Sequence, residues 1–117
     1  MIRLINRTLI IPRGDTGEFT IPTLGLVEQG DIAILAIFDP LTRTTVCEKI
    51  IPATNETLTF TFTHQDTVKI EPSNRYQWDI VIYRNPSYDE NNQLIDGETI
   101  DSYYAAFGKE MPKCVIE

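Results

Sequence analysis

Cysteine and histidine are nearly absent from this 117-residue chain, which has two cysteines, Cys47 and Cys114, and one histidine, His64. A structural zinc site takes four ligands, usually from these two residue types, so three candidates cannot complete one. A Gly-rich phosphate loop is missing too, because the six glycines stand singly at turns. We interpret both thiols as free, with a Cys47–Cys114 disulfide as the alternative. The composition therefore predicts no metal and no cofactor.

Long apolar runs and an excess of basic residues are also lacking. Arg3 and Arg7 interrupt the apolar N-terminal segment, so it does not match a secretion signal, and no run approaches the roughly 18 apolar residues of a membrane span. Ten Lys and Arg against 17 Asp and Glu give a net charge of −7. This balance disfavours nucleic acid and membrane partners, whose binding depends on clustered cations. We expect a chain without a signal peptide that folds in the cytoplasm.

The length and the apolar content that are present suit one globular domain over residues 1–117. Hydrophobic residues make up 42% of the chain, which is enough to offset the entropy of folding. We therefore predict a single folded domain rather than a disordered chain.

Period-two alternation of apolar and polar residues is the main secondary-structure signal. It is regular over 57–63 and over 76–83, and both segments are rich in β-branched or aromatic types. The nearly all-apolar run 31–38, flanked by Gly30 and Pro40, predicts a buried central strand. Weaker strands are expected at 3–11, 18–21, 44–51, 98–106 and 113–116.

Helical signals are confined to one short segment. Thr63 and Asp66 match a capping box, and Pro72 leaves room for only about one turn, over 63–68. About eight short strands without a long amphipathic helix predict an all-β fold, as an antiparallel sandwich or barrel.

The segment around Pro72 narrows this expectation. Ile70, Pro72 and Tyr76 have a spacing that resembles the tyrosine corner of immunoglobulin-like and fibronectin type III-like sandwiches, where the tyrosine hydroxyl bonds to backbone a few residues upstream. Trp78 occupies the place of the second disulfide cysteine of true immunoglobulin domains, which excludes the disulfide-bonded form. Even if Tyr76 and Trp78 are ordinary core aromatics, the prediction of a sandwich stands. We expect an antiparallel immunoglobulin-like or fibronectin type III-like β-sandwich of about 7–9 strands.

Four segments follow one another along the chain: LIIPRGDTGEFTIP, GDIAILAIFDPLTRTT, IEPSNRYQWDIVIYRNPSYDENNQL and SYYAAF. Their order is similar to that in small proteins of tailed phages and prophages of Firmicutes. In that family, an immunoglobulin-like domain resembling the N-terminal domain of baseplate upper proteins accompanies tail-fibre or baseplate components. The resemblance implies a virion structural or assembly role in the tail or baseplate, with other tail proteins or further copies of the chain as partners. It carries over no catalytic residue.

Two short motifs admit both a functional and a structural interpretation. Arg13-Gly14-Asp15 spells the integrin-binding tripeptide, yet Gly and Asp are also what a tight turn between strands requires, and we favour the turn. His64 has no nucleophile in a recognisable catalytic motif, so we favour an exposed histidine of the capping turn.

Acidic residues gather over 89–98. Counted from the first of them, the glycine position of an EF-hand holds Leu94 and the closing glutamate position holds Ile100, so the spacing excludes that calcium loop. Glu90 and Asp96 as a glycosidase pair would need one apolar and one polar environment, which a hairpin tip does not offer. We predict that the protein is not an enzyme.

Apolar side chains within segment 84–98 point to a contact surface. The segment is long for a hairpin connection, and a solvated tip would not need apolar groups. We predict that it binds a partner; the alternative is that its apolar groups pack on their own sandwich. The chain ends are a second candidate, because edge strands need cover. The candidate partner-binding residues are Tyr88, Asp89, Glu90, Leu94, Ile95 and Asp96.

The sequence thus favours a non-enzymatic virion structural or assembly module of a phage tail or baseplate, acting through protein–protein contacts. A carbohydrate-binding or host-surface-binding sandwich is the alternative, with Tyr83, Tyr88 and Tyr103 stacking on sugar rings. The acidic hairpin further predicts that its neighbour presents Lys or Arg.

Overall fold

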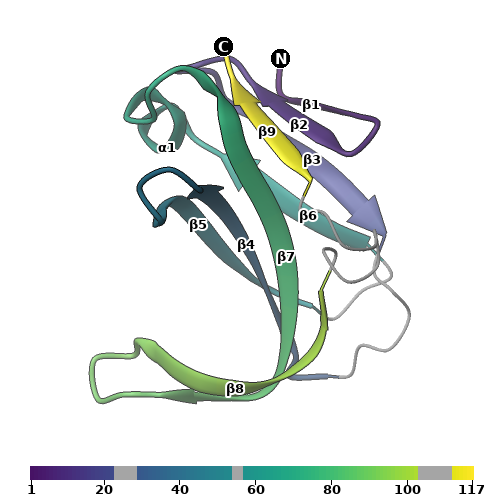
Figure 1. Cartoon of the computed structure of the whole chain (residues 1–117). Helices are drawn as coiled ribbons and strands as arrows, with labels where there is room; N and C mark the ends of the chain where they lie inside the picture. Colours follow the sequence, from purple (N-terminus) through teal and green to yellow (C-terminus); the bar gives the residue numbers. More distant parts are fainter. Residues whose placement is uncertain (23–28, 54–56, 103–111) are drawn as a thin grey trace.

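The computed structural model describes residues 1–22, 29–53, 57–102 and 112–117, and for 95–102 it describes the backbone alone (Figure 1). This part of the chain is mostly β, as predicted, with nine strands and one short helix. The elements are β1 (Arg3–Ile5), β2 (Thr8–Ile11), β3 (Gly17–Pro22), β4 (Ile32–Asp39), β5 (Thr44–Pro52), β6 (Thr57–Phe62), α1 (His64–Val68), β7 (Ser73–Tyr88), β8 (Leu94–Ser102) and β9 (Lys113–Ile116).

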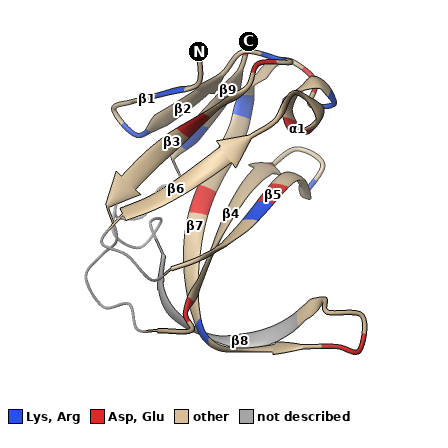
Figure 2. Ribbon diagram, turned by 180° about the vertical axis from the view of Figure 1, so that it is seen from behind, with Lys and Arg blue, Asp and Glu red and all other residues tan. Residues whose placement is uncertain are grey.

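The strands form two sheets with one core between them. The larger sheet has the order β1-β2-β9-β7-β4-β5, with β8 added against β7, and the smaller sheet consists of β3 and β6. The smaller sheet packs on the inner face of the larger one, where the rings of Phe19 on β3 and Trp78 on β7 form an edge-to-face pair with a centroid distance of 6.1 Å. Figure 2 shows β3 and β6 lying across the larger sheet. The arrangement is consistent with an all-β sandwich.

The core follows the predicted alternation closely. On β6 every second residue is buried and the threonines between them are exposed, so the interpretation of 57–63 is confirmed. The same pattern begins β7, where Tyr76, Trp78, Ile80 and Ile82 are all buried. Burying such side chains contributes about 1.5–3 kcal/mol each, which makes this shared layer the main source of stability.

Strand β7 is the spine of the larger sheet. It runs for 16 residues, twice the predicted length, and reaches nearly from one end of the molecule to the other (Figure 1). One edge pairs with β4 over residues 77–83; the other pairs first with β9, over residues 73–77, and then with β8, over residues 81–88. Residues 84–88 therefore extend past the end of β4.

Two expectations about strand arrangement were wrong. The sheet is mixed rather than antiparallel, because β9 lies between β2 and β7 and runs parallel to β2. The expected strand 3–11 is a hairpin, since Asn6 and Arg7 turn the chain with φ of 49° and 69°. Two consecutive positive φ values fit a type I′ turn, whose usual residues are asparagine followed by glycine. Asn6 matches the first position, but Arg7 stands where glycine is usual, so the turn was not recognised in the sequence.

The corner at Pro72 has the hydrogen bond that its spacing predicts. The hydroxyl of Tyr76 donates to the carbonyl oxygen of Glu71, five residues upstream, at 2.8 Å. Trp78, two residues further along, is fully buried and donates from Nε1 to the carbonyl oxygen of Arg7 at 2.9 Å. Both aromatics thus enter the core with their polar atoms satisfied.

Two ion pairs fasten the ends of β4 to β7. Beside the N-terminal end of β4, buried Asp31 accepts from Nε and Nη2 of Arg84, both at 3.2 Å. At the other end, buried Asp39 accepts from Nε of Arg75 at 3.0 Å and from its Nη2 at 2.8 Å. A bidentate pair fixes orientation as well as distance, so the two clamps set the register of the central strands.

Acid should weaken the second clamp. The hydrogen bonds from Arg75 hold the pKa of Asp39 well below its usual range, against the opposing effect of burial, and the Leu41 amide adds to the depression. A depressed pKa stabilises the fold above the unfolded-state value of about 3.9, and that contribution is lost as the pH falls further. We expect the urea midpoint of the natural chain to fall more between about pH 5 and pH 2.5 than that of Asp39→Asn. Parallel pH profiles for the two chains would contradict this.

Candidate functional site

The segment 84–98, which we call the arm, is a projecting two-stranded ribbon. Its ladder joins Arg84 to Glu98, Ser87 to Asp96 and Tyr88 to Leu94, and β4 no longer pairs with β7 at this level. Figure 1 shows the arm leaving the body of the molecule at the end opposite the two chain termini. Strands occupy most of the segment, so the hairpin connection itself is the short turn between Tyr88 and Leu94.

The ladder of the arm is irregular where the sequence contains Pro86. The register shifts between residues 84 and 87, and Asn85 has a φ of 51°. A bulge tolerates proline, which has no amide hydrogen to give to a ladder. Pro86 therefore lies at an irregular point of the strand, where its missing amide hydrogen costs no ladder bond.

Asp89 holds the tip of the arm together. Its Oδ1 accepts hydrogen bonds from the amides of Asn91 at 2.9 Å and Gln93 at 2.8 Å, and its backbone bonds to Asn92 and Gln93 close the turn. Asn92 takes a φ of 65°, which asparagine tolerates better than most residues. This candidate binding residue therefore has a structural role, because its carboxylate already serves its own turn.

The other five candidate residues differ in exposure: two are exposed, one is half-buried, and the side chains of two lie outside the described residues. Tyr88 is 46% exposed and Glu90 is exposed, while Leu94 is half-buried opposite Tyr88. The side chains of Ile95 and Asp96 lie outside the described residues, as does Tyr103. The structure thus brings Tyr88, Glu90 and Leu94 together at the end of the arm.

An apolar strip on the outer face of the larger sheet was missed in the sequence. The outer face points away from β3 and β6, and there Ile34 of β4 lies directly between Ile50 of β5 and Val81 of β7. Ile50 is 47% exposed and the other two are half-buried. The run 31–38 held the signal, because a strand with apolar residues at nearly every position is apolar on both faces.

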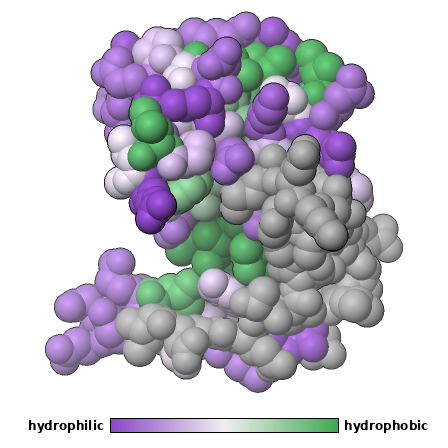
Figure 3. Space-filling model, in the orientation of Figure 1, coloured by the Kyte–Doolittle hydropathy of each residue, from purple (hydrophilic) through white to green (hydrophobic). Residues whose placement is uncertain are grey.

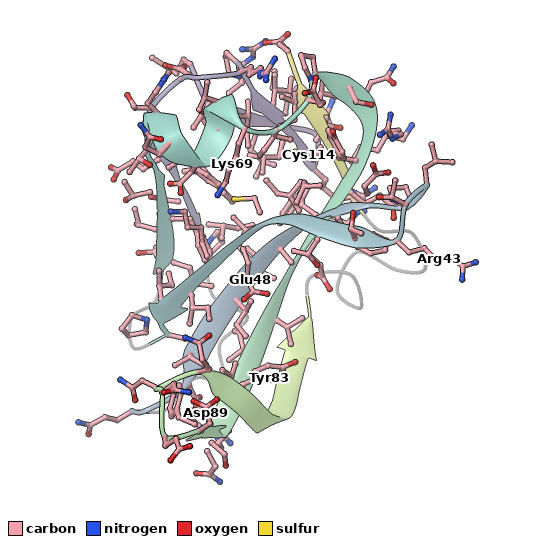
Figure 4. The ribbon with its side chains drawn as sticks, turned by 90° about the vertical axis from the view of Figure 1, so that its left-hand side faces the viewer. Arg43, Glu48, Lys69, Tyr83, Asp89 and Cys114 are labelled. Atoms are coloured by element: carbon pink, nitrogen blue, oxygen red, sulfur yellow. The ribbon has the colours of Figure 1, made fainter. Side chains whose placement is uncertain are left out.

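The arm and the turn between β4 and β5 project on the same side of the molecule, with a hollow between them. Figure 3 shows apolar atoms at the bottom of this hollow, above the root of the arm. Figure 4 looks onto that side and places Glu48 and Tyr83 between the turn, which carries Arg43, and the tip, which carries Asp89. In that turn Leu41 is 75% exposed and Arg43 is exposed, with a φ of 58°. Exposed apolar side chains on both projections are typical of a contact surface.

All three residues of the Arg13-Gly14-Asp15 tripeptide form contacts within the molecule, in agreement with its interpretation as a structural turn. Arg13 donates from Nε to the carbonyl oxygen of Val68 at 2.7 Å, and the carbonyl oxygen of Gly14 lies 2.6 Å from Nδ1 of His64. The carboxylate of Asp15 forms an ion pair with the N-terminal ammonium at 2.9 Å, which lowers its pKa. All three residues thus dock the turn onto α1 and the N-terminus.

Helix α1 starts at the predicted cap. The Thr63 hydroxyl accepts from the Asp66 amide at 3.2 Å, and the Asp66 carboxylate accepts from the Thr63 amide at 2.7 Å, so the capping box is confirmed. His64 is exposed at the first position of the helix. These contacts account for the three residues as parts of a short, well-capped turn.

The two cysteines are free and buried, in agreement with the preferred interpretation. Burial raises the pKa of Cys114 to about 12 and also raises that of Cys47. Because the thiolate is the nucleophilic form, neither side chain is activated at neutral pH.

Within the described ranges, no group of three or more His, Cys, Asp or Glu is placed to hold a metal ion. The same part of the chain contains no helix long and apolar enough to cross a membrane. Comparison with known protein families, with curated proteins and with solved structures finds no significant match to the chain. The fold and the site therefore define a mostly β, two-sheet protein with a projecting arm, and its function has to be argued from that geometry.

Proposed function

We propose that this protein is a non-enzymatic module of a phage tail or baseplate, and that it works through protein–protein contacts made by the arm. The observation that carries this proposal is the arm itself, which extends two paired strands beyond the sheet and exposes Tyr88 near its end. A two-stranded hairpin is only marginally stable alone, so a projecting one gains most from packing on a neighbour. Tyrosine is also enriched in protein interfaces.

The tail or baseplate setting rests on the resemblance of the sequence to tail-associated proteins of phages and prophages. An immunoglobulin-like sandwich agrees with the two-sheet architecture and with the hydrogen bond from Tyr76 to Glu71. In that setting the module belongs to the virion and has other tail or baseplate proteins, or a second copy, as partners.

Co-expression with the proteins encoded beside this chain's gene tests the proposal. The tagged chain should retain at least one of them, Tyr88→Asp should lose it, and Glu18→Lys should keep it, because Glu18 is exposed on β3 of the other sheet. Retention of none of these proteins, together with binding on a glycan array that Tyr88→Asp abolishes, would replace the proposal by a carbohydrate-binding function.

A further inference from the structure

The two projections that flank the hollow are complementary to each other. The turn between β4 and β5 offers the cation Arg43 beside the exposed side chain of Leu41, and the tip of the arm offers the anion Glu90 beside the exposed side chain of Tyr88. Figure 2 shows the acidic colour at the tip of the arm and the basic colour at the β4–β5 turn. Each projection thus pairs one exposed charge with one exposed apolar group, and the charges are opposite.

Both charges are available for a contact. Among the described residues the Arg43 guanidinium forms no ion pair, whereas Arg75 and Arg84 are each held by a buried aspartate. Glu90 likewise has no hydrogen bond in the described part of the chain, in contrast to Asp89, whose carboxylate is used within the turn. An ion pair between Arg43 of one molecule and Glu90 of another would give both side chains a partner.

We propose that two copies of this chain associate through the hollow, with the arm of each copy lying on the β4–β5 turn of the other. A two-fold axis through the hollow produces this arrangement, because in such an interface residue i contacts j and j contacts i. Each dimer then contains two Arg43–Glu90 contacts and two contacts between Leu41 and Tyr88. The inference rests on the proposed role of the arm as a contact surface and adds that a second copy is its partner.

The floor of the hollow agrees with a dimer of modest affinity. The strip of Ile34, Ile50 and Val81 lies on this face and becomes covered, which favours association. Glu48 and Asp79 lie on the same face, one position along from the strip, and oppose the approach of a second acidic chain. Contacts between like charges are costly, so the opposite charges of the two projections determine how the two copies are placed relative to each other.

Sedimentation velocity over about 5–500 μM tests the proposal. The natural chain should shift from monomer to dimer over this range. Arg43→Asp should weaken the dimer at least about tenfold, because each lost ion pair and each new repulsion occurs twice. Glu90→Lys should do the same. Aspartate suits the positive φ of position 43, so the first variant keeps the turn.

A mixture of the two variants gives the decisive result. Arg43→Asp and Glu90→Lys repel themselves, but in a mixed dimer position 43 of each copy faces an opposite charge at position 90 of the other. The equimolar mixture should therefore dimerise at least about tenfold more tightly than either variant alone. A change of fold or of net charge alone cannot restore association in this way.

Arg7→Asp is the matched control, because Arg7 is also an exposed turn arginine with a positive φ of 69°, in the β1–β2 hairpin away from the hollow. It should dimerise like the natural chain. A monomer at every concentration, an equal loss in Arg7→Asp, or a mixture no tighter than its components would overturn the inference. A monomer that still retains a tail protein would leave the proposed function standing, whereas a dimer that retains none would support the inference and count against the tail or baseplate setting alone.

Discussion

Replacing Asp31 with alanine is expected to lower the free energy of unfolding by about 3 kcal/mol. Asp31 is 2% exposed, and both its carboxylate oxygens accept from the guanidinium of Arg84. The substitution removes the carboxylate from a guanidinium that is only 28% exposed, and removing one partner of a largely buried ion pair is costly. Urea unfolding followed by the emission of Trp78, the single tryptophan, measures the loss.

A second substitution separates the loss of the ion pair itself from the cost of leaving the Arg84 cation largely buried. Asp31→Ala combined with Arg84→Met should recover at least about 1 kcal/mol, since replacing both partners by apolar groups is much less costly than removing one. Glu18→Ala, at an exposed carboxylate on β3, should change stability by less than about 0.5 kcal/mol. A loss below about 1 kcal/mol in Asp31→Ala would contradict the assigned role of the clamp.

The position of this clamp links stability to the arm. Arg84 is the first residue of the arm, and its bond to Asp31 ties the root of the arm to the end of β4. A rigid root keeps the tip at a fixed place relative to the β4–β5 turn, which lowers the cost of ordering when a partner binds. Asp31→Ala should accordingly weaken association through the arm even at temperatures where the variant is folded.

Local sequence patterns predicted the strands that have one face against the core and the other face in solvent. The regular alternation of β6 and of the start of β7 reports burial on one face directly, so those strands were placed correctly. The capping box at Thr63 and the corner at Tyr76 were predictable for a similar reason, because the bonding partners lie within five residues along the chain.

Pairing between distant segments was not predictable in the same way. The residues of Lys113–Ile116 carry no local signal that this strand pairs in parallel with β2. Leu9 and Cys114 are far apart in the sequence and become neighbours only when the sheet forms. The sequence did not predict how far the two strands of the arm extend, because a bulge accommodates Pro86 within β7 and Asp89 closes a tight turn at the tip. The sequence singled out the arm as a candidate contact segment, whereas the turn with Leu41 and Arg43 comes to face the arm only in the tertiary structure.

Trp78→Ala is expected to have the largest effect of any single truncation, with a loss of about 4 kcal/mol. Trp78 is fully buried in the first half of β7, its ring packs against that of Phe19 across the two sheets at a centroid distance of 6.1 Å, and its Nε1 donates to the Arg7 carbonyl oxygen in the β1–β2 turn. Alanine leaves a cavity in the layer shared by both sheets and removes the hydrogen-bond donor to the Arg7 carbonyl oxygen. Small domains are stable by only about 5–15 kcal/mol, so the variant should melt at a much lower temperature.

Two further variants assign the loss to packing and to the hydrogen bond. Trp78→Phe keeps most of the apolar volume but removes the donor to Arg7, so it should lose about 1–2 kcal/mol. Tyr88→Ala removes an aromatic ring that is 46% exposed and should lose less than about 1 kcal/mol. Thermal and urea unfolding followed by far-ultraviolet circular dichroism gives all three values. An equal loss in Trp78→Ala and Trp78→Phe would mean that the hydrogen bond to the turn, rather than the contact with Phe19, holds the two sheets in place.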